Sequence, residues 1–449
     1  MSFYNIFAEN FILPLTDKKT RWNVKKNLDF LKESQWWSKE QMIEYQNNKL
    51  QKLIIHAYDN VEYYNKLFKE YGINPKDIKT KSDLKKIPTI TKEEITKNVL
   101  NGTLIAKNIN LKYAIKAQSS GSTGVRTIYY ISPEAYGLNL ACNLRGWSWM
   151  GYSVGDKMIK VSQNERKSKI KKIQDKINRV KLFDGAYDEK GFIEFVNIFK
   201  NKNPLFLRTY PDPLVLLSNY AKNNNVEFSG LKAINTTGNI LFLEARKLIE
   251  NTFNTKVFDS YSCEGGANVF ECETHSCYHV SDEYGIIEIL DNNGNEVNEN
   301  ENGGSFVTDL SNYVTPFIRY ESKDILTKGG KCSCGRSLST VSKIVGRDND
   351  ILITPTGQML IAQNFTTYFK YIKSIDQFQV VQNSNNELTF KIKINNLHTH
   401  KINKDIKTYW QNYTGKSMNI SIQEVIDIPL LTSGKRRFLI RNKDILFNF

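Results

Sequence analysis

The spacing of apolar residues changes along the chain and predicts three regions. In residues 38–60 apolar side chains recur every three or four positions, which predicts an amphipathic helix. Ser38 and Gln41 stand three residues apart at its start, the spacing of a capping box. We expect residues 1–100 to be mostly helical, with a Pro-containing connector at residues 85–95.

The middle of the chain has a mixed pattern. From residue 113 to about residue 345, short apolar runs alternate with helical stretches, which is typical of an α/β body. The predicted strands include residues 157–161, 205–210, 231–238, 256–261 and 284–290, and the predicted helices include residues 192–200 and 241–253.

The charged turn VGRDND, residues 345–350, predicts a domain boundary. We therefore expect a large α/β N-terminal domain at residues 1–346, with mixed sheets and helices, and a small mobile α+β domain at residues 347–449. In the small domain, strands are predicted at residues 378–382, 387–395 and 418–425, and a helix at residues 400–413.

The chain is basic, with 62 Lys and Arg against 47 Asp and Glu and a net charge of +15. A solvated basic surface is the favoured interpretation, and affinity for phosphorylated ligands or polyanions is the alternative. The most basic run, residues 165–183, has apolar residues at helical spacing and predicts an amphipathic helix. Peripheral contact of this helix with anionic lipid or a phosphorylated carrier is the less favoured reading. No nucleic-acid-binding motif is found, so we expect no nucleic-acid partner.

The location of the chain follows from two absent signals. No stretch approaches the roughly 18 apolar residues of a membrane span, and the first residues lack a basic segment followed by an apolar one. We expect a cytoplasmic protein. Its six Cys should then be reduced, so clustered Cys favour a metal site over disulfides.

A loop of small residues, SSGSTG, lies between two predicted strands at residues 119–124. Its backbone N–H groups and hydroxyls could surround a phosphate, and a plain hairpin turn is the alternative. It does not have the G-x-x-x-x-G-K-[ST] pattern of a P-loop. The loop alone therefore indicates phosphate binding only moderately.

Further motifs follow this loop in an order that resembles the adenylate-forming superfamily, the acyl-CoA synthetases and their relatives. They are TTGN (236–239), DSYSCEGG (259–266), GGSFVTDLSNYVTPFIRYESKDI (303–325), VGRDND (345–350) and LTSGKRRF (431–438). Within that superfamily, VEYYNKLF, LKKIPTITKEEI, FECETHSCYHV and CSCGR are most similar to the phenylacetate–CoA ligase and CapK-like branch. The resemblance covers nearly the whole chain.

The resemblance implies an enzyme that binds ATP and Mg²⁺. Lys435 would bridge the substrate carboxylate and the α-phosphate, Glu264 would bind Mg²⁺, and Tyr261 would stack on adenine. The structural alternatives are a surface turn for Lys435, a buried acid for Glu264 and core packing for Tyr261. The implied nucleotide-binding residues are Ser119, Ser120, Gly121, Ser122, Thr123, Gly124, Thr237, Gly238, Tyr261, Asp324 and Arg347.

Several positions depart from the family pattern. Ser262 stands where Gly is usual, in a segment one residue shorter, so the register of Glu264 could shift. Asn239 replaces an acid, and Asn349 replaces an Asp in the hinge. Together these departures indicate a divergent member with its own substrate.

Two Cys-rich segments, CETHSCYH (272–279) and CSCG (332–335), suit tetrahedral Zn²⁺. The resemblance implies that they share one face, with His279 at a recurrent His. It favours Cys272, His279, Cys332 and Cys334 as a structural zinc site, with His275 or Cys277 as substitutes. Free surface thiols are the alternative, and Cys142 and Cys263 are expected in the core.

The predicted function is ATP-dependent activation of a small-molecule carboxylate to an acyl-adenylate, followed by transfer to CoA or an amine. CapK-like relatives are linked to capsule synthesis, which suggests cell-envelope polysaccharide synthesis. The alternative is a catalytically silent, nucleotide-binding scaffold in polysaccharide assembly. Trp147 and Trp149, in the segment 143–149, are expected either to line the acyl site or to be core residues.

Overall fold

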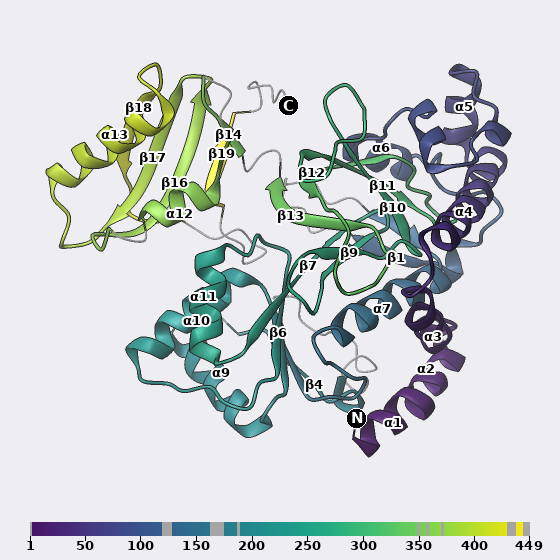
Figure 1. The fold of residues 1–449 in the computed structure, drawn as a ribbon, viewed down its shortest axis with the longest axis horizontal. Coiled ribbons are helices and arrows are strands. Elements are labelled where there is room, and N and C mark those ends of the chain that lie inside the picture. Colours follow the sequence, from purple (N-terminus) through teal and green to yellow (C-terminus); the bar gives the residue numbers. More distant parts are fainter. Residues whose placement is uncertain are drawn as a thin grey trace. The chain divides into compact units, whose positions relative to one another are not determined.

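The computed structural model describes residues 2–118, 128–161, 175–185, 189–347, 351–355, 359–369, 372–428 and 437–442. The chain forms two compact units. The first comprises Met1–Ser322 and Leu326–Ile344, and the second comprises Lys323–Ile325 and Val345–Phe449. Each unit is described by itself (Figure 1).

The first unit begins with helices, as the apolar spacing predicts. The capping box at the start of the longest one is confirmed, since Ser38 Oγ accepts from the Gln41 N–H at 3.3 Å and Gln41 Oε1 accepts from the Ser38 N–H at 2.9 Å. Among the described helices, none has the length and apolarity to cross a bilayer. The helices are α1 (Phe3–Phe7), η1 (Ala8–Ile12), α2 (Leu13–Thr20), α3 (Val24–Ser34), α4 (Lys39–Asn60), α5 (Glu62–Glu70), η2 (Pro75–Asp77), η3 (Lys81–Lys86), α6 (Lys92–Leu100) and η4 (Leu111–Tyr113).

An 11-stranded sheet forms the body of the first unit, in the order β10-β11-β12-β13-β9-β8-β7-β6-β5-β3-β4. Strands β3 to β7 pair parallel with one another. Strand β8 pairs antiparallel with β7 on one side and with β9 on the other. The strands are β3 (Met158–Val161), β4 (Val180–Phe183), β5 (Phe206–Thr209), β6 (Ala233–Thr237), β7 (Lys256–Cys263), β8 (Ala267–Glu271), β9 (Tyr278–Val280), β10 (Gly285–Leu290), β11 (Asn302–Asp309), β12 (Tyr320–Lys328) and β13 (Thr340–Arg347). A separate hairpin pairs β1 (Ile115–Gln118) with β2 (Ile128–Ile131).

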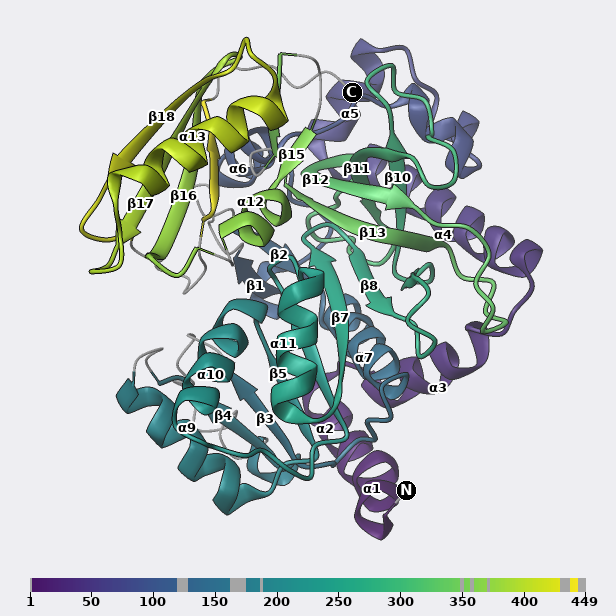
Figure 2. The ribbon, with the colours of Figure 1, turned by 60° about the vertical axis from the view of Figure 1, so that its left-hand side comes forward.

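Helices cover both faces of the parallel part of this sheet (Figures 1 and 2). On one face, α9 (Glu189–Lys202), α10 (Pro211–Asn223) and α11 (Leu243–Phe253) enclose a core with Leu207, Ile234 and Val257 of the strands. On the other face lies α7 (Pro133–Ser148). Its Gly146 touches the Phe270 ring of β8, where a Cβ would come within 2.2 Å of Phe270 Cγ. The predicted α/β architecture is confirmed.

One local prediction is wrong. Residues 165–183 were expected to form a helix, but Val180–Phe183 is strand β4, which pairs parallel with β3. Phe183 is buried in the core beneath α9 and α10, so pairing and burial outweigh the helical spacing of the apolar residues. Residues 162–174 lie outside the described residues, and so does most of the predicted basic helix.

The second unit is a small α+β domain, as predicted. Its sheet has the order β18-β17-β16-β19. Trp410 of α13 is 1% exposed and stacks on Phe365 of α12 at 4.3 Å between ring centroids, which places an aromatic core between sheet and helices. The elements are β14 (Ile351–Ile353), β15 (Met359–Ile361), α12 (Ala362–Phe369), β16 (Ile375–Ser384), β17 (Glu387–Ile394), α13 (His400–Thr414), β18 (Asn419–Glu424) and β19 (Leu439–Arg441).

Candidate active site

Three of the predicted nucleotide-binding residues, together with Glu264, lie where the parallel strands end. Ligands of open α/β sheets bind outside the carboxyl ends of the strands. Thr237 ends β6 and is half-buried, and the exposed Gly238 follows it with a positive φ of 79°. Tyr261 lies near the carboxyl end of β7, next to β6, with Glu264 just beyond it. The sheet therefore brings Thr237, Gly238, Tyr261 and Glu264 to one edge.

A tight turn fixes the position of Glu264. Gly265 and Gly266 follow it with φ of 91° and 103°, a region that favours glycine. A Cβ on Gly266 would lie 2.6 Å from the Cα of Asp309, so only glycine lets this turn pack against the end of β11. Burial and the charge of Glu264 both raise the pKa of Tyr129 on β2, which places the Glu264 carboxylate near that hydroxyl group. Glu264 is half-buried and could hold a cation.

The remaining nucleotide-binding predictions fall elsewhere. Asp324 is half-buried in β12 and directly follows Lys323, which has a φ of 61°. Arg347 ends β13, and its side chain lies outside the description. Both residues group with the second unit. Ser119, Ser120, Gly121, Ser122, Thr123, Gly124 and Lys435 all lie outside the described residues.

The replacement at Asn239 has a structural partner. Its Nδ2 donates a hydrogen bond to Oδ2 of Asp212 in the first turn of α10. An acid at position 239 would put two carboxylates in contact here and would be disfavoured. The departure from the family pattern is therefore matched by an acid on the neighbouring helix.

Sequence analysis missed a polar row on the face of the sheet towards α7. Arg208 on β5, Asn235 on β6 and Ser260 on β7 lie side by side: Arg208 Nε donates to Asn235 Oδ1 at 3.2 Å, and Asn235 Nδ2 lies 3.2 Å from Ser260 Oγ. Asn235 and Ser260 are 2% and 6% exposed. The signal in the sequence was an arginine inside the otherwise apolar strand LFLRTY.

Arg208 is an unusual cation. Among the described residues it forms no ion pair with a carboxylate, and its guanidinium lies 5.1 Å from the ring centroid of Trp147 on α7. Burial lowers the pKa of Arg208. A desolvated cation without an acid partner suits an anionic or oxygen-rich ligand. Trp147 thus belongs beside the polar row, whereas Trp149 is 7% exposed and packs in the core with Phe270.

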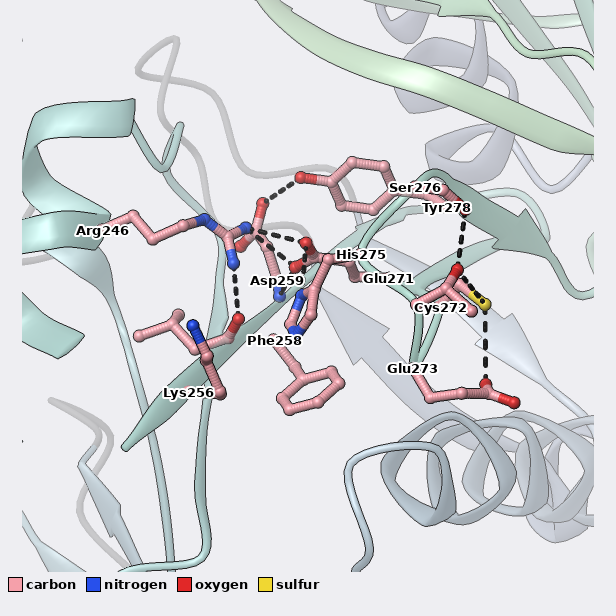
Figure 3. A network of polar contacts seen from close by, with 12 residues as sticks. Arg246, Lys256, Phe258, Asp259, Glu271, Cys272, Glu273, His275, Ser276 and Tyr278 are labelled. Atoms are coloured by element: carbon pink, nitrogen blue, oxygen red, sulfur yellow. Dashed lines mark hydrogen bonds and ion pairs between the residues drawn. The ribbon is translucent and has the colours of Figure 1, made fainter. Parts of the chain in front are cut away.

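A second polar network lies on the opposite face of β7 and β8 (Figure 3). Glu271 is its centre: its carboxylate accepts two hydrogen bonds from Arg246 at 2.8 and 3.0 Å and one from the Asp259 N–H at 2.6 Å. Asp259 accepts from the hydroxyl groups of Thr236 at 2.6 Å and Tyr278 at 3.3 Å. Burial raises the pKa of Asp259 to about 7. The network ties α11 to the strand that carries Tyr261.

The four predicted zinc ligands come together. Cys272 follows β8, His279 lies in β9, and Cys332 and Cys334 lie between β12 and β13. Their ligand atoms all lie within 4.8 Å of one another. Cys272 Sγ and Cys332 Sγ are 3.7 Å apart, close to the roughly 3.8 Å that two thiolates span on a tetrahedral zinc with Zn–S bonds of about 2.3 Å.

The chemistry of this Cys/His cluster (Cys272, His279, Cys332, Cys334) also fits a metal. Against the effect of burial, hydrogen bonds from Ser276 and the Cys334 backbone lower the pKa of Cys332, which favours a thiolate there, whereas burial raises the pKa of its neighbour Cys272. Burial lowers the pKa of His279 to about 4 and keeps the imidazole neutral, as a ligand must be. Of the substitutes, Cys277 Sγ is 3.9 Å from His279 Nε2, whereas His275 Nδ1 instead lies 3.0 Å from Glu271.

Comparison with known proteins identifies relatives along most of the chain. Residues 352–442 match the family described as the CapK C-terminal domain. The chain is similar to Protein CapK of Staphylococcus aureus, with 25% identity over 89% of each chain. It is also similar to phenylacetate-coenzyme A ligase of Aromatoleum evansii, with 23% identity over 89% of this chain and 94% of the relative.

The fold comparison agrees with the sequence matches. The chain superimposes on a 2-hydroxyisobutyryl-CoA ligase solved in the postadenylation state, with a TM-score of 0.73 and 16% identity over 92% of this chain and 93% of the other. This structural similarity concerns the fold alone. The similar sequences are a CapK protein and phenylacetate–CoA ligases, which are the branch that the sequence motifs indicated. The predicted resemblance is confirmed: over most of its length the chain is similar to proteins of the phenylacetate–CoA ligase and CapK-like branch, and its fold is that of adenylate-forming ligases.

Proposed function

We propose that this chain is an ATP-dependent, AMP-forming ligase that activates a carboxylate and transfers the acyl group to the thiol of CoA or to an amine. The observation that carries the proposal is sequence similarity along most of the chain. A CapK and a phenylacetate–CoA ligase each match 89% of this chain, and the match spans at least 89% of each of them. Both the large unit and the small one are therefore covered.

The reaction has two steps. An oxygen of the substrate carboxylate attacks the α-phosphorus of ATP, the bond to the β-phosphate oxygen breaks, and pyrophosphate leaves. The thiol or amine then attacks the acyl carbon, loses its proton, and AMP leaves. The first barrier is raised by repulsion between the carboxylate and the triphosphate, so fixed cations and N–H donors lower it. Mg²⁺, when bound, supplies further charge neutralisation at the phosphates.

We assign the chain's own residues to these tasks by their place in the motifs. Lys435 would bridge the carboxylate and the α-phosphate, Glu264 would hold Mg²⁺, and Tyr261 would stack on adenine. Asp324 would bind the ribose hydroxyl groups, and Arg347 would contact ribose or phosphate. The loop 119–124 would hold the leaving pyrophosphate, and Thr237 with Gly238 would border the adenine.

The acyl group has a proposed place too. Arg208, Asn235 and Ser260 lie on strands β5 to β7, a few residues before the strands end at Thr237 and Cys263. An acid bound at the carboxyl ends would extend its acyl part along this polar row, beneath Trp147 of α7. An oxygen-rich acid fits the row better than an aliphatic one, because the half-buried Arg208 has no carboxylate partner among the described residues.

For the Cys/His cluster we propose a structural zinc ion. Three thiolates and one imidazole form a closed set of four ligands, and such a set leaves no position for substrate. The ion would join the β8–β9 hairpin to the loop before β13. Its role would be to hold the sheet together rather than to take part in the reaction.

Two acceptors of the acyl group are proposed, each with its own biological setting. CoA is supported by the phenylacetate–CoA ligase relative. An amine acceptor in cell-envelope polysaccharide synthesis is the alternative that the resemblance to CapK-like proteins suggests. Both acceptors follow the same adenylation step, so that step is tested first.

The test is trapping of the acyl-adenylate with hydroxylamine. The purified chain, ATP and Mg²⁺ are incubated with aromatic, fatty, amino and uronic acids, and pyrophosphate release is measured. We expect release that depends on one class of acid. Lys435→Ala should lower it by at least about a hundredfold, since about 1.4 kcal/mol of barrier corresponds to tenfold. Lys416→Ala, an exposed lysine of the same unit, serves as the matched control.

The same experiment separates the enzyme from a silent scaffold. A scaffold would bind ATP without releasing pyrophosphate with any acid, and Lys435→Ala would then change nothing. Equal release by the wild type and the Lys435→Ala variant would contradict the role of Lys435 while leaving adenylation itself established.

A further inference from the structure

The N-terminal helical segment, formed by α1, η1 and α2, exposes large apolar side chains along one side. In the ribbon α1 lies at an outer end of its unit (Figure 2). The exposed apolar residues follow a spacing of three or four, and Phe7 and Phe11 stack at 5.5 Å between ring centroids. Their exposed fractions are 86% for Phe3, 47% for Ile6, 43% for Phe7, 59% for Phe11 and 70% for Leu15.

The other side of the same segment is already buried. Ala8 is 1% exposed, and it packs with Tyr4 and Leu13 into the core formed with α3 and α7. The segment therefore carries large apolar side chains on its exposed side as well as on its buried side. A helix that rests on the surface of a protein normally presents polar residues outward. The exposed row thus indicates a binding surface.

Within residues 2–28 the exposed charges have one sign, and the next acid, the exposed Asp29, pairs with Lys25 at 2.5 Å. Among residues 2–28 of the described chain, no acidic residue is exposed. Glu9 is 8% exposed and pairs with Lys32 and Lys25, and the half-buried Asp17 accepts from the Lys25 N–H at 2.8 Å. The exposed charged residues of this stretch are Lys18, Lys19, Arg21 and Lys26.

We propose that the N-terminal helical segment binds the surface of an anionic lipid bilayer. Phenylalanine and leucine side chains would enter the boundary between headgroups and acyl chains, and the lysines and Arg21 beside them would contact anionic headgroups. The segment lies flat rather than across the membrane, since no described helix can span one. The chain's net charge of +15 also favours attraction to an anionic bilayer.

Charge argues against the other occupant, a second copy of the chain. A symmetric dimer would place the same surface against itself. Lys18, Lys19 and Arg21 would then approach their own copies without an exposed acid from this segment to pair with. An anionic bilayer supplies negative headgroups for these cations and an apolar layer for the exposed Phe and Leu side chains.

The test is co-sedimentation of the full-length chain with vesicles of phosphatidylcholine alone or of phosphatidylcholine and phosphatidylglycerol at three to one. We expect binding to the anionic vesicles that weakens in high salt. Phe11→Gln/Leu15→Gln should lower the affinity at least tenfold without changing the melting temperature, because both side chains are exposed. The matched control is Leu100→Gln on α6, where the leucine is 74% exposed; this variant should bind like the wild type.

A charge variant gives an independent readout. Lys18→Glu/Lys19→Glu should also lose binding to the anionic vesicles, since it reverses two exposed charges and leaves the apolar row intact. The proposal is overturned if the wild type does not sediment with anionic vesicles, or if both variants sediment as it does. It is also overturned if gel filtration shows a dimer that Phe11→Gln/Leu15→Gln dissociates while vesicles leave the wild type unbound.

Discussion

The Nε2 atom of His279 lies 3.2 Å from the Sγ atom of Cys334, a residue 55 positions further along the chain. Strand pairing produces this proximity. Strand β9, which contains His279, pairs with β8 on one side and with β13 on the other, so the segments that follow β8 and precede β13 meet at one end of the sheet.

The Cys/His cluster gives the first prediction. We expect the purified chain to contain one zinc ion, measured by plasma mass spectrometry, and Cys332→Ser to remove it. Because loss of a structural metal is among the few strongly destabilising changes, unfolding free energy should fall by more than about 2 kcal/mol. His275→Ala should retain zinc, since His275 faces Glu271, and so should Cys142→Ala. Zinc loss in His275→Ala, or a metal-free wild type, would refute the assignment.

Arg208 gives a prediction on activity. Arg208→Gln should lower kcat/KM for adenylation by about 10- to 100-fold, because a charge-assisted hydrogen bond contributes about 1.5–3 kcal/mol. The melting temperature should stay the same or rise, because the variant removes a half-buried cation that has no acid partner among the described residues. Arg179→Gln, at an exposed arginine that directly precedes β4 in the same sheet, is the control. A lower melting temperature with unchanged kcat/KM would instead assign Arg208 a structural role.

Asp259 gives a prediction on pH dependence. Its pKa is raised by burial from 3.8 to about 7, so the folded state favours the protonated form. The stability that this protonation contributes is complete below about pH 4 and is lost as the pH rises to about 7. Asp259→Asn keeps an oxygen for Thr236 and carries no charge. It should therefore be more stable than the wild type at pH 8, by at most about 4 kcal/mol, since one pKa unit corresponds to about 1.4 kcal/mol.

The dependence of the melting temperature on pH serves as the control for this stabilisation. The difference in melting temperature between Asp259→Asn and the wild type should shrink between pH 8 and pH 5. A difference that stays constant over that range would show that the carboxyl group does not titrate there. Arg246→Met should destabilise at every pH, because it leaves the buried Glu271 without its guanidinium partner.

The turn after Glu264 gives a prediction on geometry. Gly266→Ala should destabilise the chain and reduce adenylation, since its Cβ would lie 2.6 Å from the Cα of Asp309. Gly294→Ala is a matched control, because Gly294 also has a positive φ, of 78°, but a Cβ there meets nothing within 4 Å. The control should cost only the strain of the backbone, on the order of 1 kcal/mol. Equal melting temperatures of the two variants would show that the turn can move away from β11.

Much of the fold was predictable because it depends on local patterns. The capping box at Ser38 and the period of apolar residues predicted α4, and short apolar runs predicted β3, β5, β6 and β7. Strand β4 was missed, because apolar spacing in residues 165–183 also fits a helix, and its pairing partner β3 lies 22 positions earlier. Periodicity reports which faces are buried, but not which strand becomes the neighbour.

The sequence by itself determined the candidate chemistry, since residue types and motif order supplied Tyr261, Glu264 and the Cys/His pairs. The tertiary structure alone decided which of these residues are neighbours: it separated His275 from His279, placed Asn239 beside Asp212, and set Arg208 beside Asn235 and Trp147. It also decided that Phe3, Phe11 and Leu15 of the N-terminal helical segment face outward while Tyr4 and Leu13 pack inward. The physical reason is that contact and burial are properties of packed elements, and a residue's own neighbours along the chain do not specify them.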